Sequence, residues 1–342
     1  MRQRRFAPSS SSQWIAGLIA GLIGTGLLAV LLVPPVLAQG AVPSPEGSVG
    51  GQRAQFITID GARTRYYEAG TGPEVVLLIH GARPGGTSSA NTWTPIIAGL
   101  SERYLVLAPD RLGHGMSENP TDIYTATGEM EHIYAFLKTK NVTRLHVIGQ
   151  STGAWHAARL ALEKPEMVRS LIIVDSATLS PPVGNLAERR AAIGVGQGAG
   201  AQRSGTIEDG FRFNMEALSW NKEHVTEEFV AAAGFMARQP SGMKTDAAMK
   251  GEEAKRYEAN IQAGAKEMRE WIAEGRLQAP TLLYWGRNDP SAIVEVGLQL
   301  YAMIAEKNKR AHMLIANDRG HFHYREHPAE FVQTVTAFIG RY

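Results

Sequence analysis

A chain of 342 residues, 44% of them hydrophobic and 20% charged, is long enough for one large globular domain that carries an insertion. It has 35 basic and 33 acidic residues and no tract of interleaved basic and aromatic side chains, which excludes an ordinary nucleic-acid-binding surface. It contains no cysteine, which excludes disulfides, thiolate metal sites and a cysteine nucleophile.

The N-terminus predicts export. Three arginines in the first five residues and a serine run precede the uncharged stretch 14–33, and "PPVLA" then ends at Ala38. The uncharged stretch also reaches the roughly 20 residues that span a bilayer. We therefore expect residues 1–38 to be a cleaved signal peptide or an N-terminal membrane anchor. The protein would then be periplasmic, secreted or membrane-anchored, with membrane contact only through this segment if it stays uncleaved.

Residues 39–54, "QGAVPSPEGSVGGQRA", are rich in glycine, proline and serine and predict a flexible linker. Beyond them, short apolar runs alternate with helical patterns, which predicts a mostly parallel sheet covered by helices on both faces. The expected strands are Phe56–Ile59, Arg65–Glu68, Val75–His80, Tyr104–Pro109, Leu145–Ile148, Leu171–Asp175, Thr281–Trp285 and Ala311–Ile315. The expected helices include Thr127–Lys138 and Ala154–Glu163.

The region 181–277 breaks this alternation. It carries helical patterns such as "TEEFVAAAGFMARQ" and "AKEMREWIAEG", a glycine-rich "GVGQGAG" and no convincing strand. We therefore expect a helical cap insertion that lies over the sheet's edge, within an α/β core formed by residues 55–180 and 278–342.

The stretch "VIGQSTG" places Ser151 between Gly149 and Gly153, where a strand must turn sharply into a helix. Side chains at 149 and 153 would collide in such a turn, and the turn exposes the serine hydroxyl. The N-terminus of the following helix also directs N–H groups at a developing negative charge. We interpret Ser151 as a nucleophile; the alternative is an ordinary N-cap serine.

A serine hydroxyl is a poor nucleophile until a base removes its proton, and the base needs an orienting carboxylate. The candidate base is His321, which follows a glycine in a loop between a strand and the final helix. His327 precedes a proline at a helix start and is expected to be structural. The candidate acid is Asp289, in the turn after "TLLYWG"; Asp175, at the end of "LIIVDSA", stays the alternative.

An oxyanion hole needs backbone N–H donors aimed at the anion. In "LLIHGARPGG" a strand end leads into a loop in which Ala82 can donate its N–H, and the N–H of Thr152, just after the nucleophile, would be the second donor. His80 is expected to tie down this loop and not to act as a base.

Taken together, these motifs resemble the alpha/beta-hydrolase superfamily over residues 55–180 and 278–340. "HGARPGG", "APDRLGHGMS", "GQSTG", "WGRND" and "RGH" occur in that family's order, and the order nucleophile, acid, histidine is the one the family uses. The resemblance implies that Asp110, Arg111 and Gly113 brace a turn near the site.

Within the superfamily, the nearest pattern is that of the meta-cleavage product hydrolases, which cut carbon–carbon bonds in vinylogous diketones. "HGARPGGTSSAN" resembles their His-Gly-x-x-Pro-Gly loop, and the resemblance implies that Asn91, Gln150 and Phe322 contact the substrate. The chain departs from the pattern in having Gln150 before the nucleophile and Phe322 after the histidine. Ala233 stands near the family's carboxylate-binding arginine, and Arg238 is a candidate replacement one turn on.

These observations predict a serine hydrolase that acts on a small carboxylic ester through an acyl-enzyme, without a cofactor. Carbon–carbon hydrolysis is the alternative, and a non-catalytic exported binding protein on the same fold is a third interpretation. The histidines of "HFHYREH" lack a matching helix pattern, so we expect no metal site. The partner is a small-molecule substrate.

Overall fold

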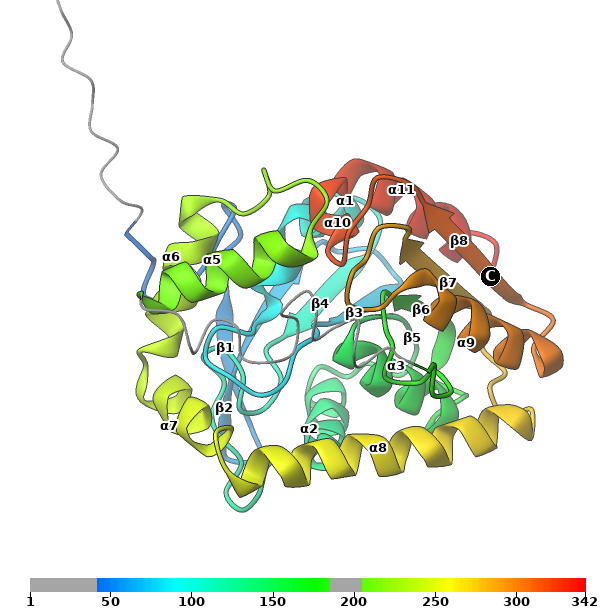
Figure 1. Ribbon diagram of the computed structural model, residues 1–342, viewed down its shortest axis with the longest axis horizontal. Helices are drawn as coiled ribbons and strands as arrows, with labels where there is room; N and C mark the ends of the chain where they lie inside the picture. The colour runs from blue at the N-terminus through cyan, green and yellow to red at the C-terminus, as the bar shows by residue number, and fades with distance from the viewer. Residues whose placement is uncertain (1–41, 185–204) are drawn as a thin grey trace, which may run out of the picture. The chain divides into compact units, whose positions relative to one another are not determined.

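The computed structural model describes residues 42–184 and 205–342, and an eight-stranded, mostly parallel sheet forms the centre of this part (Figure 1). The strand order is β1-β2-β4-β3-β5-β6-β7-β8; β1–β2 and β2–β4 are antiparallel and the other pairs parallel. The strands are β1 (Gln55–Ile59), β2 (Ala62–Ala69), β3 (Val75–Ile79), β4 (Leu105–Pro109), β5 (Leu145–Gln150), β6 (Val168–Val174), β7 (Thr281–Gly286) and β8 (Ala311–Ala316). Every predicted strand is present, and the predicted α/β fold class is confirmed.

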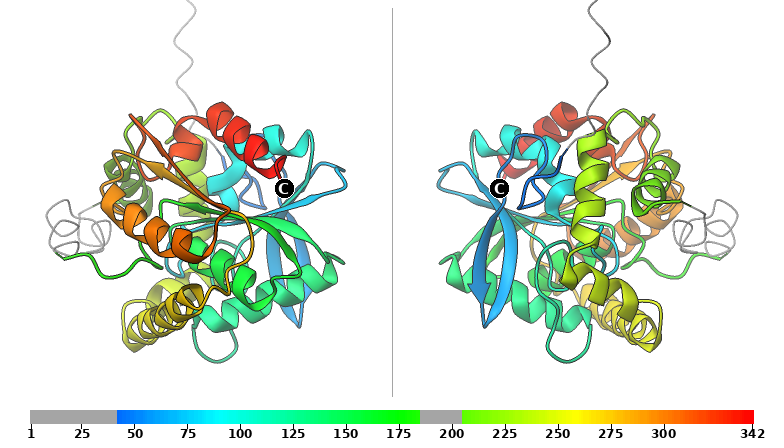
Figure 2. Two further views of the ribbon diagram at one scale, coloured as in Figure 1. Left: turned by 90° about the vertical axis from the view of Figure 1, so that its right-hand side faces the viewer. Right: turned by 90° about the vertical axis from the view of Figure 1, so that its left-hand side faces the viewer.

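Helices cover both faces of this sheet (Figure 2). Strand β3 shows how the sequence encodes the two layers: Val76 and Leu78 join one hydrophobic cluster, and Leu77 and Ile79 join the other. Because both faces are buried, the strand reads as a continuous apolar run. The first face carries η1 (Ala90–Trp93), α1 (Thr94–Ser101), α10 (His323–Glu326) and α11 (Pro328–Ile339); the second carries α2 (Ala126–Thr139), α3 (Thr152–Glu163) and α9 (Val294–Lys307).

The described part of the insertion between β6 and β7 contains helices and no strand. Its helices are α5 (Ile207–Leu218), α6 (Glu227–Ala237), α7 (Pro240–Ala248) and α8 (Glu252–Ala273). A capping box begins α5, because the Thr206 hydroxyl accepts from the Asp209 N–H while the Asp209 carboxylate accepts from the Thr206 N–H. The glycine-rich "GVGQGAG" lies outside the described residues.

Helix α8 does not lie over the sheet's edge as expected of the whole insertion, but packs along α2, α3 and α9 (Figure 1). Gly264 permits the close approach, because a Cβ there would collide with the Trp155 ring. The Trp155 indole N–H donates to the carbonyl of Ile261 at 3.0 Å. The predicted cap is therefore partly built into the hydrophobic core.

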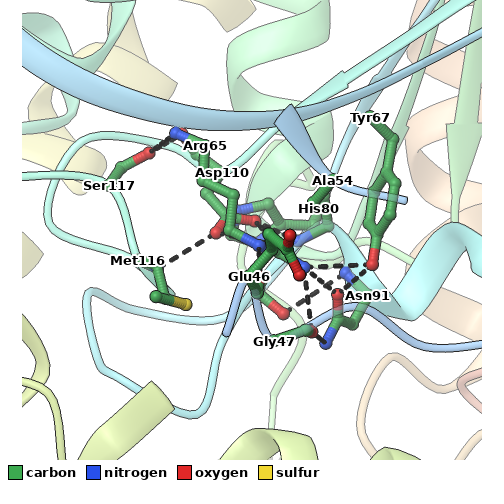
Figure 3. A network of polar contacts seen from close by, with 12 residues as sticks. Glu46, Gly47, Ala54, Arg65, Tyr67, His80, Asn91, Asp110, Met116 and Ser117 are labelled. Atoms are coloured by element: carbon green, nitrogen blue, oxygen red, sulfur yellow. Dashed lines mark hydrogen bonds and ion pairs between the residues drawn. The ribbon is translucent and has the colours of Figure 1, made fainter. Parts of the chain in front are cut away.

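The predicted linker also needs correction, because residues 42–54 pack against the core in place of forming a free tether. Val49 and Ala54 are buried. The buried guanidinium of Arg65 on β2 donates to the carbonyls of Glu46 at 2.6 Å and Gly47 at 3.0 Å, as Figure 3 shows. The composition of residues 39–54 predicted flexibility because Arg65, the residue that anchors them, lies outside this segment. We call residues 42–54 the strap.

The strap is expected to contribute to stability. Removing residues 1–54 should lower the free energy of unfolding by about 3 kcal/mol or more relative to removing residues 1–41, because Arg65 loses two buried carbonyl acceptors and Val49 leaves the core. Urea unfolding of the two truncated proteins measures the difference. Equal unfolding free energies would show that the strap contributes nothing.

The predicted leader, residues 1–38, lies outside the described residues, and so do residues 39–41 of the predicted linker. Among residues 42–184 and 205–342, no helix combines the length and apolar character needed to cross a membrane.

Candidate active site

Ser151 stands in the turn between β5 and α3, with φ of 52° and ψ of −125°. This left-handed backbone costs a residue with a Cβ on the order of 1 kcal/mol. The two flanking glycines are required as predicted: a Cβ on Gly149 would lie 2.5 Å from the carbonyl oxygen of Gly153, and one on Gly153 would collide with the carbonyl oxygen of Ile79. The turn thus stores strain at the predicted nucleophile.

His321 and Asp289 are 32 positions apart in the chain and meet at the carboxyl edge of the sheet. The His321 Nδ1 lies 2.7 Å from Asp289 Oδ2, and both residues are buried. The other oxygen of Asp289 accepts from the backbone N–H groups of Ser291 at 2.6 Å and Ala292 at 3.0 Å. Asp289 is therefore held at both oxygens and fixes the orientation of the His321 ring.

Asp175, the alternative acid, pairs with a different histidine. Its Oδ1 accepts from the Gly286 N–H at 2.8 Å, and its Oδ2 lies 3.0 Å from His323 Nε2. Burial, followed by the nearby Asp289 charge, raises the pKa of Asp175 well above its ordinary value, while burial lowers the pKa of His323 to about 4. The geometry therefore favours Asp289 as the carboxylate that orients His321.

The loop after β3 carries the predicted oxyanion donor. Ala82 has φ of 69°, again a left-handed conformation, and lines two cavities together with Ser151. His80 ties this loop down: its Nε2 accepts from the Arg111 backbone N–H at 3.1 Å, so its Nδ1 carries the proton and donates to the Gly81 carbonyl at 3.0 Å. Burial lowers the pKa of His80 well below its usual range, so the ring stays neutral.

A first cavity of about 210 Å³ opens beside Ser151 and His321 and extends under the cap. Gln150 also lines it, and donates from its Nε2 to the His321 carbonyl at 3.2 Å. Of the described residues that line this cavity, none is an arginine or a lysine. Its apolar wall is formed by Phe211, Met215, Leu218, Phe229 and Phe322.

A second cavity shares Ser151 and His321 with the first but is otherwise lined largely by different residues. Thr152, the second predicted oxyanion donor, lines it, and so does Tyr257 from α8. Arg83 supplies this cavity with a cationic side chain. The reacting carbonyl would therefore sit between an apolar cavity and a more polar one.

Asn91 does not line either cavity, and the prediction that it contacts substrate needs correction. Its side chain is fully buried in the network of Figure 3, where Oδ1 accepts from Arg65 at 2.6 Å and from the Tyr67 hydroxyl at 2.7 Å, and Nδ2 donates to the Gly47 carbonyl at 2.8 Å. The buried guanidinium of Arg65 needs hydrogen-bond acceptors, and the side-chain oxygen of Asn91 is one of them.

Neither candidate for the carboxylate-binding position of the cap reaches the cavities. Arg238 is 54% exposed at its side chain and forms an ion pair with Glu208, and Ala233 is buried within α6. Among the described residues, no three histidine, aspartate or glutamate side chains form a possible metal site. His321 and His323 are instead paired with one carboxylate each.

Sequence reasoning missed the cap residues that line the first cavity, including Phe211 and Phe229, and missed Ser291, which lines both cavities. The apolar residues of "FRFNMEALSW" were a signal for Phe211, and those of "TEEFVAAAGFMARQ" for Phe229. Ser291 had a signal as well, since it directly follows the predicted acid and its proline.

The family follows from a comparison with known families. The model of the alpha/beta hydrolase fold matches residues 74–328, which is most of the chain. This chain belongs to the alpha/beta hydrolase fold family. The three residues predicted to form the triad follow strands β5, β7 and β8, in the chain order that this fold uses.

Two curated relatives of this alpha/beta hydrolase that align over most of its length are hydrolases. It is 26% identical over 296 residues to the 2-hydroxy-6-oxononadienedioate/2-hydroxy-6-oxononatrienedioate hydrolase of Cupriavidus pinatubonensis, covering 84% of this chain and 95% of that one. It is 27% identical to the 2-hydroxymuconate semialdehyde hydrolase of a Pseudomonas species, covering 83% and 92%. The meta-cleavage product hydrolase of Pseudomonas fluorescens shares the fold, with a TM-score of 0.67, 24% identity and coverage of 84% and 97%. The chain is thus an enzyme of the hydrolase class.

Proposed function

We propose that this alpha/beta hydrolase cleaves a small, uncharged carboxylic ester through an acyl-enzyme on Ser151. The observation that carries the proposal is the joint placement of Ser151, His321 and Ala82 on the walls of the same two cavities, with Asp289 bonded to the far side of the His321 ring. Such an arrangement serves acyl transfer, because it supplies a nucleophile, a base and an anion site around one carbonyl group.

The steps follow from this arrangement. Asp289 holds Nδ1, so Nε2 is the ring nitrogen of His321 that takes the Ser151 proton while the serine oxygen attacks the carbonyl carbon. The N–H groups of Ala82 and Thr152 then stabilise the oxyanion. His321 returns the proton to the departing alcohol, and water, activated by the same ring, releases the acid.

The first cavity favours an apolar acyl group. Its apolar wall offers dispersion contacts and desolvation, whereas the described part of its lining offers no cation for a carboxylate. Export, as the leader predicts, also suits an esterase better than an enzyme acting on intracellular pathway intermediates.

The relatives favour a second function, carbon–carbon bond hydrolysis, and they support it more directly than they support the ester. Two of them are hydrolases of 2-hydroxy-6-oxo dienedioates and of 2-hydroxymuconate semialdehyde. For such a substrate, Arg83 in the second cavity is a cation that a carboxylate could meet.

A substrate panel separates the two functions. On the protein lacking residues 1–38, p-nitrophenyl esters of increasing acyl length should be turned over with higher kcat/KM than 2-hydroxymuconate semialdehyde, by about tenfold or more. Arg83→Ala is the matched variant: it should leave ester turnover unchanged. A higher kcat/KM for the semialdehyde, weakened by Arg83→Ala, would replace the ester by the carbon–carbon substrate.

A further inference from the structure

The fully buried Arg111 lies behind the predicted oxyanion hole without reaching either cavity. Its Nη2 donates to the carbonyl oxygen of Gly81 at 3.0 Å and to that of Ala82 at 2.6 Å. The two carbonyls flank the strained residue, so a single guanidinium holds the left-handed turn from both sides. A strained conformation persists when its surroundings fix it in this way.

The peptide between Gly81 and Ala82 is trans, as no described peptide bond is cis. In a trans peptide the carbonyl and the N–H point in opposite directions. Arg111 and His80 both donate to the Gly81 carbonyl, which draws it toward the buried side. The Ala82 N–H is thereby turned the other way. Ser151 lies against this loop, since a Cβ on Gly81 would come within 2.7 Å of the Ser151 Cβ.

A buried network holds Arg111 itself. Its Nη1 lies 2.5 Å from Glu129 Oε2 and 3.2 Å from the hydroxyl of Tyr257, and that hydroxyl also donates to Glu129 at 3.3 Å. Burial acts to raise the pKa of Glu129, but Arg111 and His156 outweigh it and leave the pKa lowered, so the carboxylate stays charged. Tyr257 belongs to cap helix α8 and also lines the second cavity.

We propose that Arg111 is a positioning residue for catalysis, which aligns the Ala82 N–H with the oxyanion, and that Tyr257 links the cap to this alignment. The proposal rests on the proposed serine hydrolase function and extends it. Arg111 does not touch the substrate; it acts through the Gly81–Ala82 peptide. A lysine at 111 has a single nitrogen, which cannot replace both Nη1 at Glu129 and Nη2 at the two carbonyls.

The test compares Arg111→Lys with Arg65→Lys, a matched control. Arg65 is also fully buried and paired with a carboxylate, at 3.1 Å from Asp110, but it bonds to the strap and not to the loop of Ala82. Arg111→Lys should lower kcat on the best p-nitrophenyl ester about 100-fold, approaching the loss of an oxyanion donor, with little change in KM. Arg65→Lys should keep kcat near that of the wild type while losing stability.

A transition-state analogue separates alignment from general damage. The Ki of a trifluoromethyl ketone, whose adduct places an oxyanion in the hole, should rise for Arg111→Lys by the factor by which kcat/KM falls. The pH profile of kcat/KM should stay unchanged, because the His321–Asp289 pair is not touched. Tyr257→Phe, the milder change, removes the hydroxyl that bonds to Arg111 and Glu129 but leaves Arg111 in place, and should lower kcat about fivefold.

Failure of the positioning role of Arg111 can be distinguished from failure of the proposed hydrolase function. Wild-type kcat and Ki in Arg111→Lys, or an equal loss of kcat in Arg65→Lys, would overturn the positioning role. If Arg111→Lys does not fold, Tyr257→Phe carries the test, and unchanged kcat and Ki in that variant overturn the link to the cap. A wild-type protein that neither turns over an ester nor reacts with a fluorophosphonate refutes the proposed function itself.

Discussion

Ser151→Ala is expected to abolish turnover of p-nitrophenyl esters, with a loss in kcat of about a million-fold. The alanine keeps the Cβ and removes only the hydroxyl that attacks the carbonyl. The free energy of unfolding should stay within about 0.5 kcal/mol of wild type, because Gly149 and Gly153 still permit the turn. Steady-state rates and urea unfolding of the two proteins measure both effects.

The prediction depends on comparing the rate of turnover with the free energy of unfolding. Lost turnover with an unchanged unfolding curve assigns the hydroxyl to the chemistry. Retained turnover would remove Ser151 from the mechanism, whichever substrate the enzyme uses.

Asp289→Asn is expected to lower kcat about 10⁴-fold. The asparagine oxygen can still accept from the N–H groups of Ser291 and Ala292, so the local turn should survive. Its amide N–H would then face Nδ1 of His321 and favour the wrong tautomer of the ring. Steady-state kcat, measured on protein with an unchanged circular dichroism spectrum, checks the prediction.

Asp175→Asn provides the control, because Asp175 is the alternative acid on sequence grounds. Its carboxylate pairs with His323 and not with His321, so kcat should stay within about tenfold of wild type. If instead Asp175→Asn produced the large loss and Asp289→Asn the small one, the assignment of the triad acid would be reversed.

The centre of the sheet could be predicted from the sequence because its strands β3 to β7 are buried on both faces and read as apolar runs. Strand β3 is an example, with alternate residues in two different hydrophobic clusters. Helix α8 could not be placed in the same way. Its docking depends on Gly264 meeting Trp155, a contact between residues more than one hundred positions apart that no local pattern reveals.

The candidate site also has one part that the sequence predicts and another that it does not. The nucleophile turn is encoded locally, since Gly149, Ser151 and Gly153 are within five positions and sterics alone select them. The position of Asn91 was predicted wrongly because its environment is set by Arg65, 26 positions away on strand β2. A loop motif specifies where the backbone passes, whereas the direction of each side chain depends on the partners that the fold brings to it.

The most direct test of the account is the mass of the intact protein after rapid quenching during turnover of a slowly hydrolysed p-nitrophenyl ester. We predict a mass increase equal to one acyl group, located by peptide mapping on Ser151 and missing from Ser151→Ala. An acyl group on another residue, or turnover by a protein whose Ser151 stays unmodified throughout, would contradict the account.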